Sequence, residues 1–274
     1  MANELRRVDE FAVITLNRPD ALNALSFELI RDLNAKFDEV ARSDARALII
    51  TGAGSKAFCA GADIKELFGR TLMQQKQGGD LGQATFAKLD TLPIPSVAVI
   101  NGYAFGGGME LALACTFRLA TPNAKMGTPE IKLGLIPGAG GTQRLPRVIG
   151  VEAALNMIVS GEPVKSDMLA MLPGQKLFDL MVENKDNLLQ EAISFAQSVV
   201  GTSPLPLVRH LPCKHPNADA FFKFSLNMVN GMTKGVPIAE SYRGVMPFLV
   251  SDTIRTLLLL FFPGISLWLV GVLT

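Results

Sequence analysis

The amino-acid sequence predicts an α/β fold, and three observations support this prediction. Short apolar runs suited to buried strands occur at residues 11–16, 47–51 and 97–100. Segments with helical spacing or composition lie between these runs and after them, and this alternation is typical of α/β proteins. Hydrophobic residues make up 49% of the 274 residues and charged residues 19%, so the chain can bury a sizeable core.

The first elements are a strand, a helix and a second strand. Residues 11–16 (FAVITL) predict a buried strand that ends at the turn Asn17-Arg18-Pro19-Asp20. Ser26 is suited to cap the helix that follows, because its hydroxyl can accept from a free N–H of the first turn. The apolar residues of this helix recur at helical spacing: Phe27, Ile30, Leu33, Phe37 and Val40. The second strand is predicted at residues 47–51.

The middle of the chain is polar before it becomes apolar again. Residues 68–92 predict a mobile connection that leads into a helix at residues 83–89. A proline-containing break separates this helix from the strand at 97–100. Three consecutive glycines at 106–108 then precede a helix predicted at 109–116.

The C-terminal part is predicted to be helical. Residues 142–149 and 151–159 follow a glycine-rich loop, and amphipathic helices are predicted at 187–200 and 218–232. The final residues, 256–274 (TLLLLFFPGISLWLVGVLT), contain no charged residue. Their length is borderline for a membrane span, and a Pro-Gly pair interrupts them. A packed helix pair or an altered terminus is therefore favoured over a membrane anchor.

Composition and spacing exclude several classes of function. The net charge of +1 provides no basic surface for nucleic acid. Cys59, Cys115 and Cys213 lack the spacing of a disulfide framework or a metal site. With no signal peptide, the sequence predicts a cytoplasmic protein without a bound metal. The glycines at 52–54 and 138–141 match neither a dinucleotide fingerprint nor a Walker loop.

Two glycine-bearing turns carry the strongest chemical signal. Residues 56–65 (KAFCAGADIK) and 101–110 (NGYAFGGGME) each follow an apolar run and lead into a helical segment. Glycine lets backbone N–H groups approach a ligand closely. Two such turns can each direct one N–H at the same oxygen, which is the geometry of an oxyanion hole. Glu110 and Glu130 stand beside these glycines, although either one alone is more often a capping or surface carboxylate.

Three motifs in order give the chain a family resemblance. KAFCAGADIK and NGYAFGGGME are followed by GTPEIKLGLIPGAGGTQRL at residues 127–145. Together they resemble the crotonase (enoyl-CoA hydratase/isomerase) family, including the hydratase part of multifunctional fatty-acid oxidation proteins. The resemblance is in register over residues 8–161 and continues more loosely to about residue 244.

The resemblance implies an architecture and an assembly. It implies a crotonase-like spiral of ββα repeats with a helical C-terminal region, which we expect as a core at 1–200 and a helical region at 201–255. The apolar tail at 256–274 is atypical and matches no pattern of the family. It also implies a homotrimer or a dimer of trimers, and a separate β-oxidation dehydrogenase as a possible partner. No cofactor is expected, because coenzyme A is part of the acyl-CoA substrate.

The resemblance also implies roles for individual residues. The N–H groups of Ala62 and Gly107 would form the oxyanion hole. Glu130 would donate a proton to the α-carbon, and Glu110 would orient and deprotonate the attacking water, which the Gly138 N–H helps to position. The substrate-binding residues implied are Ala60, Ala62, Asp63, Ile64, Lys65, Gly107 and Gly138.

Three functions follow as hypotheses. The favoured one is a 2-enoyl-CoA hydratase of fatty-acid β-oxidation, because both glutamates are present. The second is a Δ3,Δ2-enoyl-CoA isomerase of the same fold, for which one glutamate suffices. The third is a truncated, non-catalytic segment that only binds acyl-CoA, which the abrupt apolar terminus suggests. Departures from the family pattern are Thr116, where many relatives have aspartate, and Asp20-Ala21, where some have basic residues.

Overall fold

A computed structural model describes residues 3–172 and 177–201 of the chain. The predicted helix at 218–232 and the apolar tail at 256–274 lie outside the described residues, as does all of the predicted helical region beyond Gly201. Within the described part, no helix is both long and apolar enough to cross a membrane.

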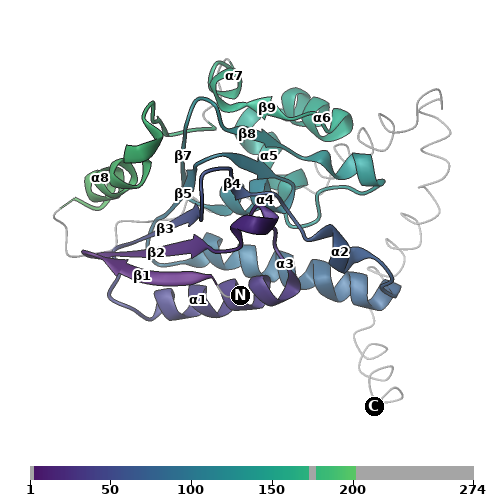
Figure 1. The fold of residues 1–274 in the computed structure, drawn as a ribbon, viewed down its shortest axis with the longest axis horizontal. Helices are drawn as coiled ribbons and strands as arrows, with labels where there is room; N and C mark the ends of the chain where they lie inside the picture. The colour runs from purple at the N-terminus through teal and green to yellow at the C-terminus, as the bar shows by residue number, and fades with distance from the viewer. Residues whose placement is uncertain (1–2, 173–176, 202–274) are drawn as a thin grey trace, which may run out of the picture. The chain divides into compact units, whose positions relative to one another are not determined.

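Two β-sheets organise the part of the chain that the structure describes (Figure 1). The larger sheet has six strands in the order β1-β2-β3-β5-β7-β10, in which only the β1–β2 pair is antiparallel. Its strands are β1 (Glu4–Val8), β2 (Phe11–Leu16), β3 (Ala47–Gly52), β5 (Ser96–Ile100), β7 (Phe117–Ala120) and β10 (Leu180–Met181). The smaller sheet has the order β4-β6-β8-β9, with strands β4 (Ala57–Cys59), β6 (Tyr103–Phe105), β8 (Lys125–Gly127) and β9 (Val164–Lys165).

The chain repeats one motif along these sheets. A strand of the large sheet is followed by a strand of the small sheet and then by helix, in the series β3-β4, β5-β6 and β7-β8. The helices are α1 (Phe27–Ala41), α2 (Ile64–Leu67), α3 (Leu72–Thr91), α4 (Gly107–Ala114), α5 (Gly141–Ile149), α6 (Val151–Ser160), α7 (Ser166–Ala170) and α8 (Leu188–Val200). Short 3₁₀ turns are η1 (Pro19–Ala21), η2 (Pro129–Leu133) and η3 (Lys185–Asn187). The predicted α/β fold with ββα repeats is confirmed.

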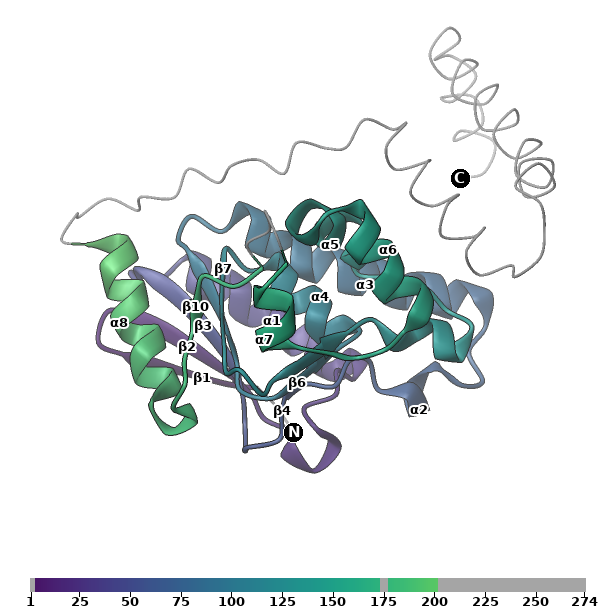
Figure 2. The same ribbon diagram turned by 90° about the horizontal axis from the view of Figure 1, so that it is seen from above.

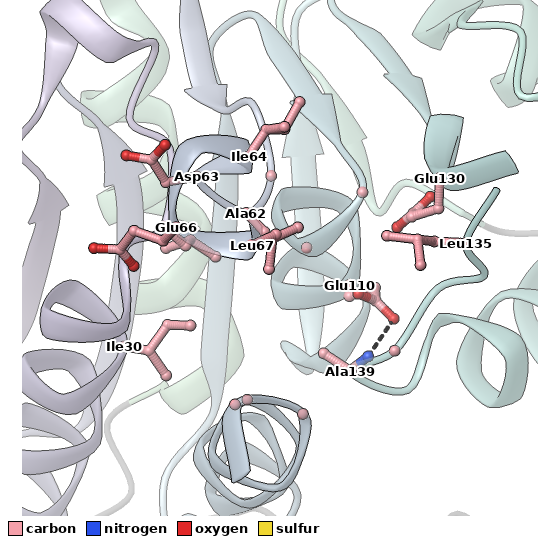
Figure 3. A pocket seen from close by; sticks show the side chains of 18 of the residues that line it. Ile30, Ala62, Asp63, Ile64, Glu66, Leu67, Glu110, Glu130, Leu135 and Ala139 are labelled. Atoms are coloured by element: carbon pink, nitrogen blue, oxygen red, sulfur yellow. Dashed lines mark hydrogen bonds between the residues drawn. The ribbon is translucent and has the colours of Figure 1, made fainter. Parts of the chain in front are cut away.

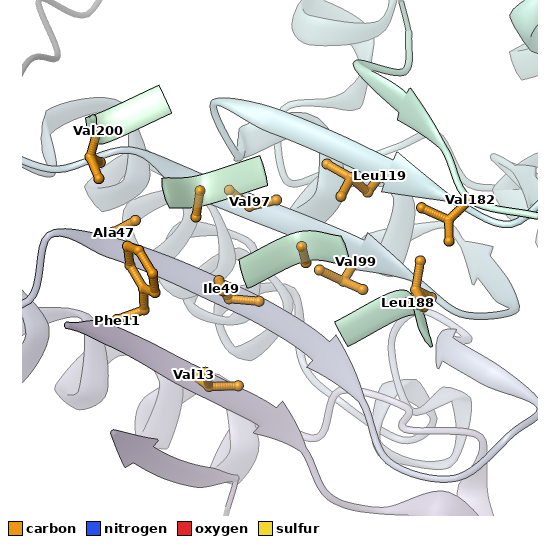
Figure 4. Packing of buried hydrophobic residues seen from close by; sticks show 12 residues of the cluster. Phe11, Val13, Ala47, Ile49, Val97, Val99, Leu119, Val182, Leu188 and Val200 are labelled. Atoms are coloured by element: carbon orange, nitrogen blue, oxygen red, sulfur yellow. The ribbon is translucent and has the colours of Figure 1, made fainter. Parts of the chain in front are cut away.

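The inner strands β2, β3 and β5 of the large sheet are buried on both faces, which explains their nearly continuous apolar sequences. Helix α8 packs on one face, and α1, α3 and α4 lie on the other (Figure 2). Alternate residues of β2, β3, β5 and β7 meet α8 in a buried cluster (Figure 4). The cluster includes Phe11, Val13, Ala47, Ile49, Val97, Val99 and Leu119 from the strands and Leu188, Ala192, Ala196 and Val200 from α8.

One element differs clearly from its prediction. The sequence predicts a mobile connection before a helix at 83–89, but α3 is one helix over Leu72–Thr91. Thr71 and Gln74 form a capping box at its start, which satisfies free N–H groups of the first turn. Packing of α3 on α1 then offsets the weak helix propensity of the glycines at 78, 79 and 82.

Helix α4 packs so closely on β4 that Gly108 has no room for a side chain. A β-carbon at Gly108 would overlap the carbonyl oxygen of Cys59 and lie 2.8 Å from its carbonyl carbon. We therefore expect Gly108→Ala to lower the free energy of unfolding by about 1–3 kcal/mol, because backbone atoms must move. Gly79→Ala is the matched control: nothing lies within 4 Å of its β-carbon, so the gain in helix propensity should leave stability equal or higher. Urea unfolding of both variants tests this, and equal losses would contradict the close packing.

Candidate active site

The backbone N–H groups of Ala62 and Gly107 lie close together, just after the ends of β4 and β6. These strands pair in parallel, so the segments that follow them lie side by side. A β-carbon at Gly107 would be 3.6 Å from the nitrogen of Ala62. Gly61 and Gly106 have φ angles of +100° and +48°, which L side chains rarely adopt. Among the described residues, neither the Ala62 nor the Gly107 N–H has a hydrogen-bond acceptor, so both are free to bind an oxygen.

Two buried asparagines hold the loop that precedes β4. The side-chain amide of Asn23 donates to the carbonyls of Ala53 and Ala57 at 3.0 and 2.8 Å. The amide of Asn101 donates to the carbonyls of Gly52 and Gly54, both at 2.9 Å. These contacts were not predicted, because the sequence does not show which carbonyls a distant asparagine reaches. They hold the loop and the first residue of β4, the strand that precedes Ala62.

Glu110 is a buried carboxylate in the first turn of α4, only 3% exposed. Its Oε1 accepts hydrogen bonds from the N–H groups of Ala139 and Gly141, both at 2.7 Å. Figure 3 shows the bond from Ala139. Burial raises the pKa of Glu110, while these two N–H groups and the positive charge of Arg144 oppose that rise. One oxygen of Glu110 is thereby held by the backbone.

Glu130 approaches the same space from η2 but lacks the backbone partners that Glu110 has. Its Oε2 is buried and has no hydrogen-bond partner among the described residues. Burial first, and then the charge of Glu110, raise the pKa of Glu130 to about 7. The pKa of each carboxyl is therefore raised by burial, but two N–H groups oppose that rise at Glu110, whereas Glu130 keeps its proton to much higher pH than an ordinary glutamate.

Both glutamates and both N–H groups line one largely apolar pocket of about 260 Å³. Figure 3 shows Glu110 and Glu130 on one side of it and the segment from Ala62 to Leu67 across from them. The predicted site residues that line it are Ala60, Ala62, Asp63, Ile64, Gly107, Glu110, Glu130 and Gly138. Its apolar surface comes mainly from Leu25, Phe27, Ile30, Leu67, Phe86, Leu133, Leu135 and Ile136.

Lys65 is an exception to the prediction, since it does not line this pocket. Its backbone N–H donates to Asp63 Oδ1 at 3.1 Å, which caps the start of α2, and its side chain is exposed. Asp63 lines the pocket but its other oxygen binds Arg18 at 2.6 Å. This contact with Arg18 lowers the pKa of Asp63, so the carboxylate stabilises the turn rather than offering a proton.

The raised pKa of Glu130 predicts a pH dependence of stability. A carboxyl with a pKa of about 7 in the folded protein keeps a proton that the unfolded chain, with a pKa near 4.5, releases. The free energy of unfolding should therefore fall as pH rises from about 4.5 to about 7, by as much as about 3 kcal/mol. Urea unfolding across this range should show wild type losing stability relative to Glu130→Gln, which cannot ionise. Parallel curves for the two proteins would contradict the raised pKa.

Comparisons with known proteins show which sequences and folds this chain resembles. Residues 7–210 match the family model described as enoyl-CoA hydratase/isomerase. The Bacillus subtilis protein YngF is 52% identical over 157 residues, which are 57% of this chain and 60%, less than two thirds, of that relative. The short-chain-enoyl-CoA hydratase of Clostridium acetobutylicum is 38% identical over 202 residues, covering 73% of this chain and 76% of that protein. An enoyl-CoA hydratase structure from Bacillus anthracis aligns with a TM-score of 0.71 at 33% identity, covering 84% of this chain and 90% of that one.

Proposed function

Because the chain belongs to the enoyl-CoA hydratase/isomerase family, we propose that it adds water across the 2,3-double bond of 2-enoyl-CoA thioesters. The observation that carries the proposal is the pair of glutamates in one pocket, one with an oxygen held by backbone N–H groups and the other with a pKa of about 7. A hydration needs one group to accept a proton from water and another to supply one to carbon.

The thioester oxygen would bind the N–H groups of Ala62 and Gly107. As water attacks the β-carbon, electrons move onto this oxygen, and the two N–H groups stabilise the enolate charge. Removal of one such donor typically costs about 10²–10³-fold in rate. The donors belong to backbone fixed by β4 and β6, so they need little reorganisation during the reaction.

The two glutamates divide the proton transfers in this proposal. Glu110 takes a proton from the water as its oxygen bonds to the β-carbon. Glu130 gives its proton to the α-carbon as the enolate collapses. Glu110 ends protonated and Glu130 ionised, and exchange of one proton between them restores the starting state. Gly138 is proposed to help position the water.

The pathway and the assembly are proposed from the family resemblance. We place the reaction in fatty-acid β-oxidation in the cytoplasm, with coenzyme A carried by the substrate and no further cofactor. A homotrimer or dimer of trimers, and a dehydrogenase partner, are the assemblies proposed. Sedimentation of the full chain tests whether it forms the homotrimer or the dimer of trimers.

Hydration of a short 2-enoyl-CoA, followed by loss of its conjugated absorbance, tests the proposed activity. Turnover that saturates with substrate is the expected result. Conversion of a 3-enoyl-CoA without hydration would instead support the isomerase, which the proton held by Glu130 could serve alone. Binding of acyl-CoA without either turnover would support the non-catalytic segment.

A further inference from the structure

We propose that Arg144 is a positioning residue for Glu110, and that it acts by fixing the backbone of residues 138–141 with a guanidinium group anchored on Asp90. The proposal rests on the hydratase function above, since it concerns how Glu110 is held for the attack of water. It assigns a role to a charged side chain that is not among the residues lining the pocket.

The guanidinium group of Arg144 bridges helix α3 and the loop. Its Nη2 lies 2.6 Å from Asp90 Oδ2, and its Nη1 donates to the carbonyl of Ala139 at 3.2 Å. The Arg144 side chain is only 13% exposed, so the pair is partly shielded from water and ions. Gln83, also on α3, donates to the adjacent carbonyl of Gly138 at 2.7 Å. Two consecutive loop carbonyls are therefore tied to one helix.

These carbonyl contacts hold the same short segment whose N–H groups bind Glu110. The Ala139 N–H and the Gly141 N–H both converge on Glu110 Oε1. Between them, Gly140 has a φ of +109°, and a β-carbon there would overlap the Arg144 guanidinium. Each peptide plane is rigid and joins a carbonyl to the next N–H, so the Gln83 contact to the Gly138 carbonyl fixes the Ala139 N–H directly. The Arg144 contact to the Ala139 carbonyl fixes the next plane, which carries the Gly140 N–H and lies between the two donors to Glu110.

The charge of Arg144 adds to this geometric effect. The charged groups that face Glu110 are Arg144 from α5 and Glu130 from η2, with Asp90 of α3 behind Arg144. The arginine offsets part of the cost of an ionised, buried Glu110. Loss of the arginine should therefore both misdirect the carboxylate and make it bind its proton more tightly.

Arg144→Gln, Arg144→Lys and the control Arg147→Gln test the proposal in the full chain. Arg147 lies on the same helix, is exposed, and donates to its own helix at Gln143. The measurements are kcat and KM for hydration of a short 2-enoyl-CoA, and a ¹³C-carboxyl titration of Glu110 assigned with Glu110→Gln. The titration reports on Glu110 whether or not the protein turns over substrate.

Arg144→Gln should lower kcat by about 10²-fold with little change in KM, and raise the midpoint of the Glu110 titration. Arg144→Lys keeps the charge, so the midpoint should stay near that of wild type, while kcat still falls because an ammonium group lacks the fork that spans Asp90 and Ala139. Arg147→Gln should change neither quantity.

Three outcomes have distinct meanings. If Arg144→Gln matches Arg147→Gln in both measurements, the proposal is overturned. It is also overturned if kcat and thermal stability fall together while the Glu110 titration stays at its wild-type midpoint. That result would mean that Arg144 stabilises the fold without acting on Glu110. An inactive wild type whose Glu110 midpoint still rises in Arg144→Gln would contradict the hydratase function and support the positioning role.

Discussion

Glu130→Gln should lower the rate of hydration by about 10²–10⁴-fold, because a carboxamide cannot give a proton to the α-carbon. Glutamine has nearly the shape of the protonated carboxyl, which the raised pKa of Glu130 makes the favoured form up to about pH 7. The pocket should therefore keep its structure, and substrate binding should change little. The effect belongs in kcat, as expected for an interaction made in the transition state.

The measurement is loss of conjugated absorbance on a short 2-enoyl-CoA, together with a binding constant for the saturated acyl-CoA. Glu152→Gln is the matched control, because Glu152 is an exposed carboxylate in the first turn of α6. A rate for Glu130→Gln within tenfold of this control would contradict the proposed role of Glu130 as the proton donor.

Glu110→Gln should be the second severe substitution, with a loss of hydration of about 10²–10⁴-fold. The amide oxygen can still accept the hydrogen bonds from Ala139 and Gly141, so the loop should stay in place. The amide group cannot take a proton from water. The loss should therefore appear in hydration and leave acyl-CoA binding intact.

The same variant separates the hydratase from the isomerase. Moving a double bond from the 3- to the 2-position needs one proton shuttle and no water, which Glu130 alone could supply. Conversion of a 3-enoyl-CoA that persists in Glu110→Gln would place that activity on Glu130. Hydration that survives in Glu110→Gln would contradict the role of Glu110 as the base.

The repeated strand-strand-helix order was predictable because it depends on local patterns. Apolar runs of strand length mark β2, β3 and β5, and their continuous apolarity follows from burial on both faces. Helix α3 was the exception, since its three glycines obscure a helix that a capping box and packing on α1 stabilise. The packing of α3 on α1 outweighed the weak helix propensity of its glycines.

The sequence by itself determined which residues could meet in the pocket. Glycines at 61 and 106 permit the backbone angles that leave two N–H groups free, and the motifs place Glu110 and Glu130 beside them. These are local requirements, so a linear motif carries them. They did not distinguish Lys65, which does not line the pocket, from its neighbours.

The tertiary structure alone decided the environment of each charged group. Arg18 and Asp63 pair across 45 positions of sequence, and Arg144 and Asp90 across 54. Likewise, Glu110 receives N–H groups 29 and 31 residues away, whereas Glu130 Oε2 receives none from the described residues. A pKa depends on burial and on the partners of a carboxylate, and both are set by which distant segments pack together. The motif supplies two glutamates, and the fold gives one of them two N–H partners and leaves an oxygen of the other without a partner among the described residues.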